Sequence, residues 1–330
     1  MTTEPHLHAG EDTYTWKEGW ATPPDGPLGD LGWAHHALVV TGDGRVVGAQ
    51  SGGSVVCFYS EDGRLLSSWE SGLTEIHGMM LDGNDHLWIA DPALKAVPDG
   101  AGGYLADTPG AHGLVACFDL DGRRLRELPL PDHPAYADNR YQPTAVVVAD
   151  DGAIWVADGY GQSLVHRYSP EGTLTLTLTG EEGAGRFDCP HGLFVDHRTD
   201  VPRLYIADRT NARIQIFDLE GKFLRSLTDG LNSPSAMVTY HSQLVVAELQ
   251  ARLAIFDIDD RLVGHLGEDE TAASRPGWPN AIAEDGSVVR PPGLRPGEFN
   301  SPHGLAVNSR GDLLVAEWLV GGRMVRLDRS

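Results

Sequence analysis

Three histidines occupy the same short sequence context at widely separated points of the chain. They are His77 in the letters IHG, and His191 and His303 in PHG, each directly before an apolar run. Neutral imidazoles are good ligands for divalent transition metals, and three of them with one open position are the usual form of a catalytic zinc site. The recurrence therefore predicts a metal centre on these three residues, with Zn²⁺ expected and another divalent metal as the alternative.

A structural explanation of the histidines is the alternative to a metal centre. The PHG letters could be a turn preference of a repeated unit, with each imidazole hydrogen-bonded to the backbone. Against this, Thr144 and Ser235 hold the equivalent positions of two other units, so a hydroxyl can serve the same turn. His36 holds the equivalent position of a further unit. It is a candidate additional ligand or outer-sphere partner, with a structural role as its alternative.

Two further residues could contribute chemistry on the same rim. Tyr160 and Arg209 follow strand-ending aspartates in the letters ADGY and ADR. A nearby cation favours the phenolate, so a tyrosine beside a metal can act as an acid or base. An arginine can hold a carboxylate through paired N–H bonds. We predict that both are catalytic, and a solvated rim position is the alternative for each.

Carboxylates end most of the strands that precede this rim. We expect them to accept backbone N–H bonds from neighbouring strand starts, and orienting the histidines is the alternative. The residues are Asp91, Asp158, Asp208, Glu248 and Glu317.

The elements that must position these residues come from a repeat of about 40 to 50 residues, the length typical of a propeller blade. Its clearest copy, 190–227, reads as four short strands with alternating apolar residues and Gly or Asp turns. Copies begin near residues 35, 76, 142, 190, 233 and 301. We therefore expect an all-β fold, a single six-bladed β-propeller over 1–330.

The ends of the chain and its insertions complete this expectation. The last copy lacks a fourth strand, which residues 13–20 should supply to close the ring, after an N-terminal arm 1–12. Insertions at 92–112, 129–140 and 267–300 fall in connections on the face where the first strands begin. Alternate blades of a six-bladed ring are related by an approximate threefold axis, so the three histidines should converge on the central channel.

Composition excludes several classes of partner. The 330 residues carry a net charge of −22, from 25 basic and 47 acidic residues, so the field repels phosphate backbones and anionic lipid. We expect a small-molecule or peptide-like substrate, no nucleic acid and no membrane. The chain has three cysteines without a CxxC pair, no signal-like N-terminus and no long apolar run. A cytoplasmic protein is therefore expected.

At this point the sequence resembles a known family. The repeats resemble NHL repeats, and blades two, three, four and six are similar to the peptidyl-α-hydroxyglycine α-amidating lyases. The similarity is carried by IHGMMLDGNDHLWIADPA, VADDGAIWVADGYGQSLVHRYSPEG, PHGLFVDHRTDVPRLYIADRTNARIQIF and SPHGLAVNSRGDLLVAEW. It implies a six-bladed propeller with a catalytic zinc on His77, His191 and His303, a catalytic Tyr160 and an active-site Arg209. The implied reaction cleaves the C–N bond of a carbinolamide to an amide and glyoxylate.

The chain departs from that family at its disulfides and its calcium site. The family's disulfide cysteines are replaced here by Tyr141 with Gly161 and by Tyr205 with Ile216, which fits a reducing compartment. The aspartate that the resemblance assigns to a structural Ca²⁺ is replaced by Gly304, which argues against that ion.

A third departure lies at the start of blade one. A second active-site arginine implied by the resemblance has no match there, where the letters LGWAHHAL contain Trp33, His35 and His36. This difference bears on the substrate and leaves the metal ligands intact. The leading hypothesis is a zinc-dependent lyase for a carbinolamide or related α-hydroxy compound. A lactonase-like metal-dependent hydrolase and a non-catalytic NHL-type binding module are the alternatives.

Overall fold

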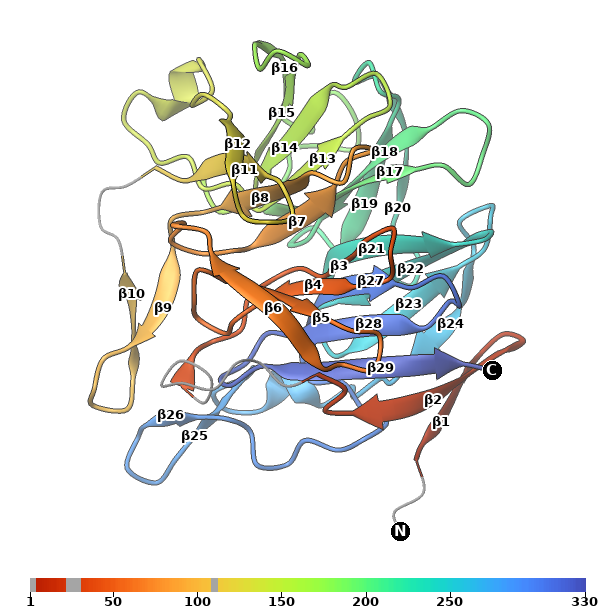
Figure 1. The fold of residues 1–330 in the computed structure, drawn as a ribbon. Coiled ribbons are helices and arrows are strands. Elements are labelled where there is room, and N and C mark those ends of the chain that lie inside the picture. The colour runs from red at the N-terminus through yellow and green to blue at the C-terminus, as the bar shows by residue number, and fades with distance from the viewer. Residues whose placement is uncertain (1–3, 22–30, 108–111) are drawn as a thin grey trace.

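The computed structural model describes residues 4–21, 31–107 and 112–330. Its strands form five four-stranded sheets and one five-stranded sheet, arranged as blades around a central channel (Figure 1). Two short hairpins and two single-turn 3-10 helices lie outside the blades. The all-β, six-bladed prediction is confirmed. None of the helices within the described ranges is long and apolar enough to cross a membrane.

The first five blades each consist of four antiparallel strands, with the first strand beside the channel and the fourth at the outer edge. In blades one to three they are β3 (Val39–Val40), β4 (Val46–Ala49), β5 (Val55–Tyr59), β6 (Leu65–Glu70); β7 (Gly78–Leu81), β8 (Leu87–Asp91), β11 (Leu114–Phe118), β12 (Arg124–Glu127); and β13 (Ala145–Val148), β14 (Ile154–Asp158), β15 (Leu164–Tyr168), β16 (Leu174–Leu178). In blades four and five they are β17 (Pro190–Asp196), β18 (Arg203–Asp208), β19 (Arg213–Phe217), β20 (Phe223–Leu227); and β21 (Pro234–Tyr240), β22 (Gln243–Glu248), β23 (Arg252–Phe256), β24 (Leu262–Leu266).

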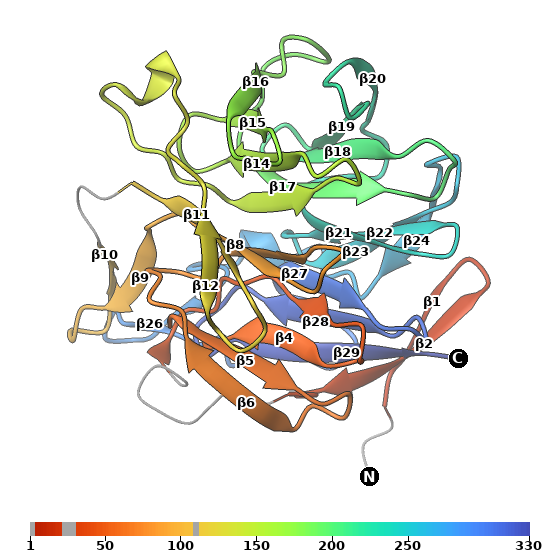
Figure 2. The same cartoon turned by 45° about the horizontal axis from the view of Figure 1, so that its top comes forward.

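The sixth blade joins the two ends of the chain. It contains β27 (Pro302–Val307), β28 (Leu313–Glu317) and β29 (Arg323–Arg329), and then β2 (Asp12–Glu18) and β1 (His6–Ala9). The N-terminal strand β2 lies beside β29 in Figure 2, and Trp16 pairs with Leu327 in that register. The expected closure of the ring by an N-terminal strand is confirmed. The arm expected over 1–12 contributes a further strand, β1, at the outer edge.

The hydrophobic core lies between neighbouring blades. Second strands such as β14 are buried along their whole length, because each is covered on both faces by the adjacent blades. Outer strands such as β20 alternate between half-buried and exposed side chains, and β20 ends at the buried Leu227. Ring closure adds its own core, in which Trp16 packs against Phe299 with ring centroids 4.7 Å apart. Closure and blade stacking together hold the first strands rigidly around the channel.

The insertions form short elements of their own. The first contains the hairpin β9 (Lys95–Pro98) and β10 (Tyr104–Asp107), and the second contains η1 (Pro134–Tyr136). The third contains η2 (Ala272–Ser274), β25 (Ala281–Ile282) and β26 (Val288–Val289). The β9–β10 and β25–β26 hairpins extend from the same side of the molecule in Figure 1. They also touch, because the Val288 N–H donates to the Gly102 carbonyl. Residues 108–111 of the first insertion lie outside the described ranges.

Candidate metal and active site

The three predicted histidines meet at one end of the channel. Their ring centroids lie 4.9 Å apart for His77 and His191, 4.9 Å for His77 and His303, and 4.8 Å for His191 and His303. The nearly equal distances show the approximate threefold relation of alternate blades. The Nε2 atoms of His191 and His303 are 3.1 Å apart, and all three side chains are buried.

A bulge in the first strand turns His191 and His303 toward the axis, whereas His77 directly precedes the regular strand β7. In β17, Pro190 pairs with Asp208 and Gly192 pairs with Ala207, which leaves His191 between them without a partner. The same shift in β27 surrounds His303. A bulged residue is released from the ladder and its side chain is re-aimed. The following glycine lets the next blade approach, since a Cβ on Gly192 would lie 2.4 Å from the Ser235 carbonyl oxygen.

Backbone carbonyls fix the orientation of two of the rings. Nδ1 of His77 lies 2.7 Å from the Thr144 carbonyl oxygen, and Nδ1 of His191 lies 3.0 Å from that of Ser235. A carbonyl can only accept, so Nδ1 carries the proton and Nε2 presents a lone pair to the centre. Nδ1 of His303 has no hydrogen-bond partner among the described residues. Burial holds the pKa of all three imidazoles well below the ordinary value, which keeps them in the neutral, metal-binding form.

Tyr160 points at the same centre from the turn after β14. Its phenol oxygen lies 3.2 Å from Nε2 of His77 and 3.1 Å from Nε2 of His191. Asp158 anchors this turn by accepting the backbone N–H groups of Gln142 and Gln162, each at 2.6 Å. Burial raises the pKa of the Tyr160 phenol, so the hydroxyl is neutral in the metal-free centre.

Arg209 lies over Tyr160. Its guanidinium carbon is 5.5 Å from the centroid of the Tyr160 ring, and Nη1 lies 3.5 Å from the phenol oxygen. Within the described ranges it forms no ion pair with a carboxylate, unlike Arg213 beside it, which pairs with Asp208. The structure therefore brings Tyr160 and Arg209 together with the three histidines. A half-buried arginine in this setting suits a carboxylate from a ligand.

The fourth imidazole of the centre belongs to His35 and not to His36. One ring nitrogen of each of His35, His77, His191 and His303 lies within 4.8 Å of the others. His36 occupies the position in blade one that the repeat predicts. Its Nδ1, however, bonds the Ala37 carbonyl oxygen at 2.8 Å, and its side chain is not part of the cluster. The regular strand β3 starts only at Val39, so both histidines lie in the irregular segment before it.

His35 and its partner Glu75 were not singled out as site residues by the sequence. Nδ1 of His35 lies 2.7 Å from Oε1 of Glu75, and its Nε2 lies 2.9 Å from the phenol oxygen of Tyr160. Burial lowers the pKa of His35 to about 3 and raises that of Glu75 well above its usual range. The available signals were the doubled histidine in blade one and a glutamate two residues before His77.

The carboxylates at the strand ends accept backbone N–H groups, as predicted from the sequence. Asp91 accepts the N–H groups of Thr74 and Glu75, at 2.7 and 3.1 Å. Glu317 accepts that of Ser301 at 2.8 Å, and Asp208 and Glu248 make the same kind of bond in their blades. These bonds hold the segments before the first strands. His77 and His191 are oriented by carbonyls and His35 by Glu75.

An aromatic wall, defined here as Trp33, Tyr104, Trp278 and Trp318, stands beside His35. The Trp33 and Trp318 rings stack with centroids 5.6 Å apart, and Tyr104 and Trp278 meet them edge-on at 5.2 and 5.9 Å. Trp318 lies 5.7 Å from the His35 ring. Two of these side chains come from the insertions, which therefore shape the surroundings of the histidine cluster. All four are half-buried.

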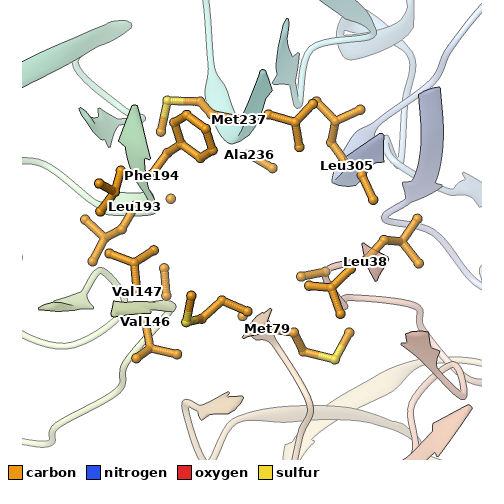
Figure 3. A pocket seen from close by; sticks show the side chains of 18 of the residues that line it. Leu38, Met79, Val146, Val147, Leu193, Phe194, Ala236, Met237 and Leu305 are labelled. Atoms are coloured by element: carbon orange, nitrogen blue, oxygen red, sulfur yellow. The ribbon is translucent and has the colours of Figure 1, made fainter. Parts of the chain in front are cut away.

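The central channel lies on the other side of the three histidines from Tyr160, Arg209 and His35. It encloses about 510 Å³ and is lined mainly by apolar side chains of the first strands, including Leu38, Met79, Leu193 and Met237 (Figure 3). His77, His191 and His303 line it too, whereas Tyr160, Arg209 and His35 do not. These three histidines, called the tripod from here on, therefore lie between an apolar channel and the polar side of the site that contains Tyr160, Arg209 and His35.

The donor set fits a divalent transition metal. Neutral imidazole suits Zn²⁺, Fe²⁺, Cu²⁺ and Ni²⁺, whereas Ca²⁺ requires oxygen ligands. The carboxylates that line the channel, Asp82 and Asp150, lie beyond the ends of β7 and β13, away from the histidines at the strand starts. The arrangement therefore offers nitrogen ligands at the tripod.

Comparison with known proteins finds NHL-repeat proteins and amidating lyases among the similar sequences. No family model matches it. It is 27% identical over 281 residues to human NHL repeat-containing protein 3, which covers 77% of this chain and 76% of that protein. It is 26% identical over 258 residues to peptidyl-alpha-hydroxyglycine alpha-amidating lyase 1 of Drosophila melanogaster, covering 73% of this chain and 37% of that protein. The chain is a six-bladed propeller with homologues among NHL-repeat proteins and amidating lyases.

Other matches agree on the fold of this propeller and limit what the similarity says. Mouse NHL repeat-containing protein 3 is 31% identical over 209 residues, which is 57% of this chain and 56% of that protein. The matched region therefore spans little more than half of that relative. A solved streptogramin B lyase superposes with a TM-score of 0.55, covering 98% of this chain and 100% of the other at 13% identity. At that identity the likeness concerns the fold alone.

Proposed function

We propose that the propeller is a zinc-dependent lyase that cleaves the C–N bond of a carbinolamide bearing a carboxylate. The observation that carries the proposal is the convergence of Tyr160 and three imidazoles whose free nitrogens face one point. His77, His191 and His303 would hold the metal. Homology to proteins named as amidating lyases supports the same reaction class.

The roles of the residues follow from their positions. When bound, a divalent cation would supply Lewis acidity to the substrate hydroxyl and favour the phenolate of Tyr160. Tyr160 then takes the hydroxyl proton, the C–O group becomes a carbonyl, and the C–N bond breaks. Returning that proton to the amide nitrogen balances the reaction and regenerates the phenolate. Arg209 holds the substrate carboxylate through paired N–H bonds, so the products are an amide and glyoxylate.

Product analysis tests the proposed reaction. Zinc-loaded protein is incubated with an N-acyl-α-hydroxyglycine, and glyoxylate and the amide are measured together. The lyase should release both in equal amounts, faster than the uncatalysed breakdown measured with His303→Ala protein. A rate that matches this variant would exclude the lyase. Hydrolysis of a lactone by the same zinc-loaded protein would instead support the hydrolase alternative.

Relatives named only for their NHL repeats keep a binding role as the second candidate. Because some relatives are named for their NHL repeats and others as amidating lyases, homology alone does not separate the two functions. A binding module needs no convergence of imidazoles, phenol and guanidinium on one point, whereas a lyase does. We also propose a cytoplasmic setting, which the three free, buried cysteines support.

A further inference from the structure

We infer that His35 is a fourth metal ligand, held in place by Glu75, so that the resting centre of this protein is formed by four imidazoles. The inference rests on the metal centre of the proposed function and extends it. It concerns the start of blade one, where the sequence has no match for the second arginine implied by the resemblance, and it changes which groups a substrate meets on entering the site.

The first argument is the position of the His35 ring. Its centroid lies 4.5 Å from that of His77 and 4.6 Å from that of His303, closer than the members of the tripod lie to one another. Tyr160 covers a different edge of the tripod, with centroids 5.2 Å from His77 and 5.7 Å from His191. His35 therefore stands over one side of the tripod and the phenol over another.

The second argument is the carboxylate behind the ring. Metal-bound histidines almost always donate their remote N–H to a carboxylate or a carbonyl, which fixes the ring and raises its basicity. His77 and His191 use carbonyls, and His35 uses Oε1 of Glu75 at 2.7 Å. With Nδ1 directed at Glu75, Nε2 of His35 faces the centre. All three rings therefore show the outer-sphere contact of a ligand.

The third argument is that the backbone of Glu75 is held in place and that its side chain has no second hydrogen-bond partner among the described residues. Its backbone N–H donates to Asp91 at 3.1 Å, so the strand-start brace of blade two also sets the carboxylate. The side chain is buried, and Oε2 has no hydrogen-bond partner among the described residues. A buried carboxylate is costly unless it is paired or works beside a cation. Its placement behind His35 is explained by a cation on the far side of that ring.

Four imidazoles complete the tetrahedral set that a Zn²⁺ ion prefers. A three-histidine centre keeps an open position for substrate, but a four-histidine centre has none at rest. Substrate must therefore add a fifth ligand or replace His35, whose Nε2 already lies 2.9 Å from the Tyr160 hydroxyl. We expect the coordination to change when an α-hydroxy acid binds.

The test counts imidazoles directly and uses the neighbouring histidine as a matched control. X-ray absorption spectra of the zinc-loaded protein give the number of imidazole ligands, and competition with a chelator gives zinc affinity. The variants are His35→Asn, Glu75→Gln and the control His36→Asn. We expect four imidazoles in the wild type and the control, and three in His35→Asn. Glu75→Gln should weaken zinc binding roughly 10- to 100-fold.

The outcomes separate this inference from the metal centre itself. Zinc bound by three imidazoles in the wild type, with affinity unchanged in His35→Asn, would overturn the fourth ligand and leave the proposed metal centre standing. Absence of stoichiometric zinc in the wild type would overturn both. If His35→Asn does not fold, the wild-type imidazole count and the Glu75→Gln affinity still decide the question.

Discussion

The phenol oxygen of Tyr160 lies 3.1 Å from Nε2 of His191. The two residues come from adjacent blades, and the nitrogen is the one left free by the Ser235 carbonyl. The contact places a proton-transfer group at the point where the imidazoles can bind a cation. The proposed carbinolamide lyase requires a base beside the metal, since the substrate hydroxyl must lose its proton there.

Replacing Tyr160 with Phe should lower kcat for glyoxylate release by roughly 10²- to 10⁴-fold, the usual contribution of a positioned acid or base. Zinc content should stay at the wild-type level, because the histidines provide the ligands. Tyr240→Phe, at the far end of β21, is the matched control and should keep full activity. An unchanged kcat in Tyr160→Phe would remove the phenol from the mechanism.

Arg209→Ala should act on the substrate's carboxylate. We expect kcat/KM to fall about 10- to 100-fold for an N-acyl-α-hydroxyglycine, because a hydrogen bond to a charged group is worth about 1.5–3 kcal/mol. An analogue with the carboxylate converted to a methyl ester provides the comparison. The variant and the wild type should cleave that ester at similar rates. Equal losses on both substrates would show that Arg209 supports Tyr160 and does not hold the carboxylate.

The metal-free protein should lose stability on acidification. Burial lowers the pKa of His35 to about 3, and those of His77, His191 and His303 also fall. The unfolded chain takes up protons first, so stability is full above pH ~6.5 and is lost below it. Protonation of His35 in the unfolded chain alone should lower the free energy of unfolding by about 1.4 kcal/mol between pH 7.5 and pH 5.5. Glu75, whose pKa burial raises, acts in the opposite direction and offsets part of this loss.

Urea denaturation at pH 7.5 and 5.5 measures this effect. His303→Gln should show a smaller decrease in unfolding free energy between the two pH values, because one buried imidazole is gone. If the wild type were equally stable at both, the histidines would have to be accessible to protons in the folded state.

The aromatic wall should influence which acyl group is accepted. Trp318→Ala is expected to lower kcat/KM roughly 10-fold for substrates with a large apolar acyl group, through lost ring contacts, and to leave N-acetyl substrates nearly unaffected. Trp69→Ala, on the outer strand β6, serves as the control. A uniform loss across all substrates would indicate that Trp318 supports His35 and not the substrate.

Much of the metal centre could be predicted because its residues occupy equivalent positions of the sequence repeat. His77, His191 and His303 share one position in alternate blades, and ring symmetry makes such positions meet regardless of the details of packing. The same reasoning led to the closing strand β2, since a blade without a fourth strand leaves an edge unpaired. Tyr160 and Arg209 followed because the ends of second strands lie on the same rim.

The remaining features depend on irregular backbone, where alternation gives no guide. His35 and His36 are neighbours, and only the path of the chain before Val39 decides which ring reaches the cluster. Glu75 acts across a blade boundary, at a contact that no repeat position encodes. The aromatic wall is assembled by insertions, and its rings meet only through tertiary packing of the loops.

Metal content of protein purified without an affinity tag tests the central claim most directly. The wild type should contain about one zinc ion per chain, and both His191→Ala and His303→Ala should lose it while retaining the β-rich circular dichroism of the propeller. A folded wild-type protein with no stoichiometric metal, after incubation with zinc and removal of excess, would contradict the account.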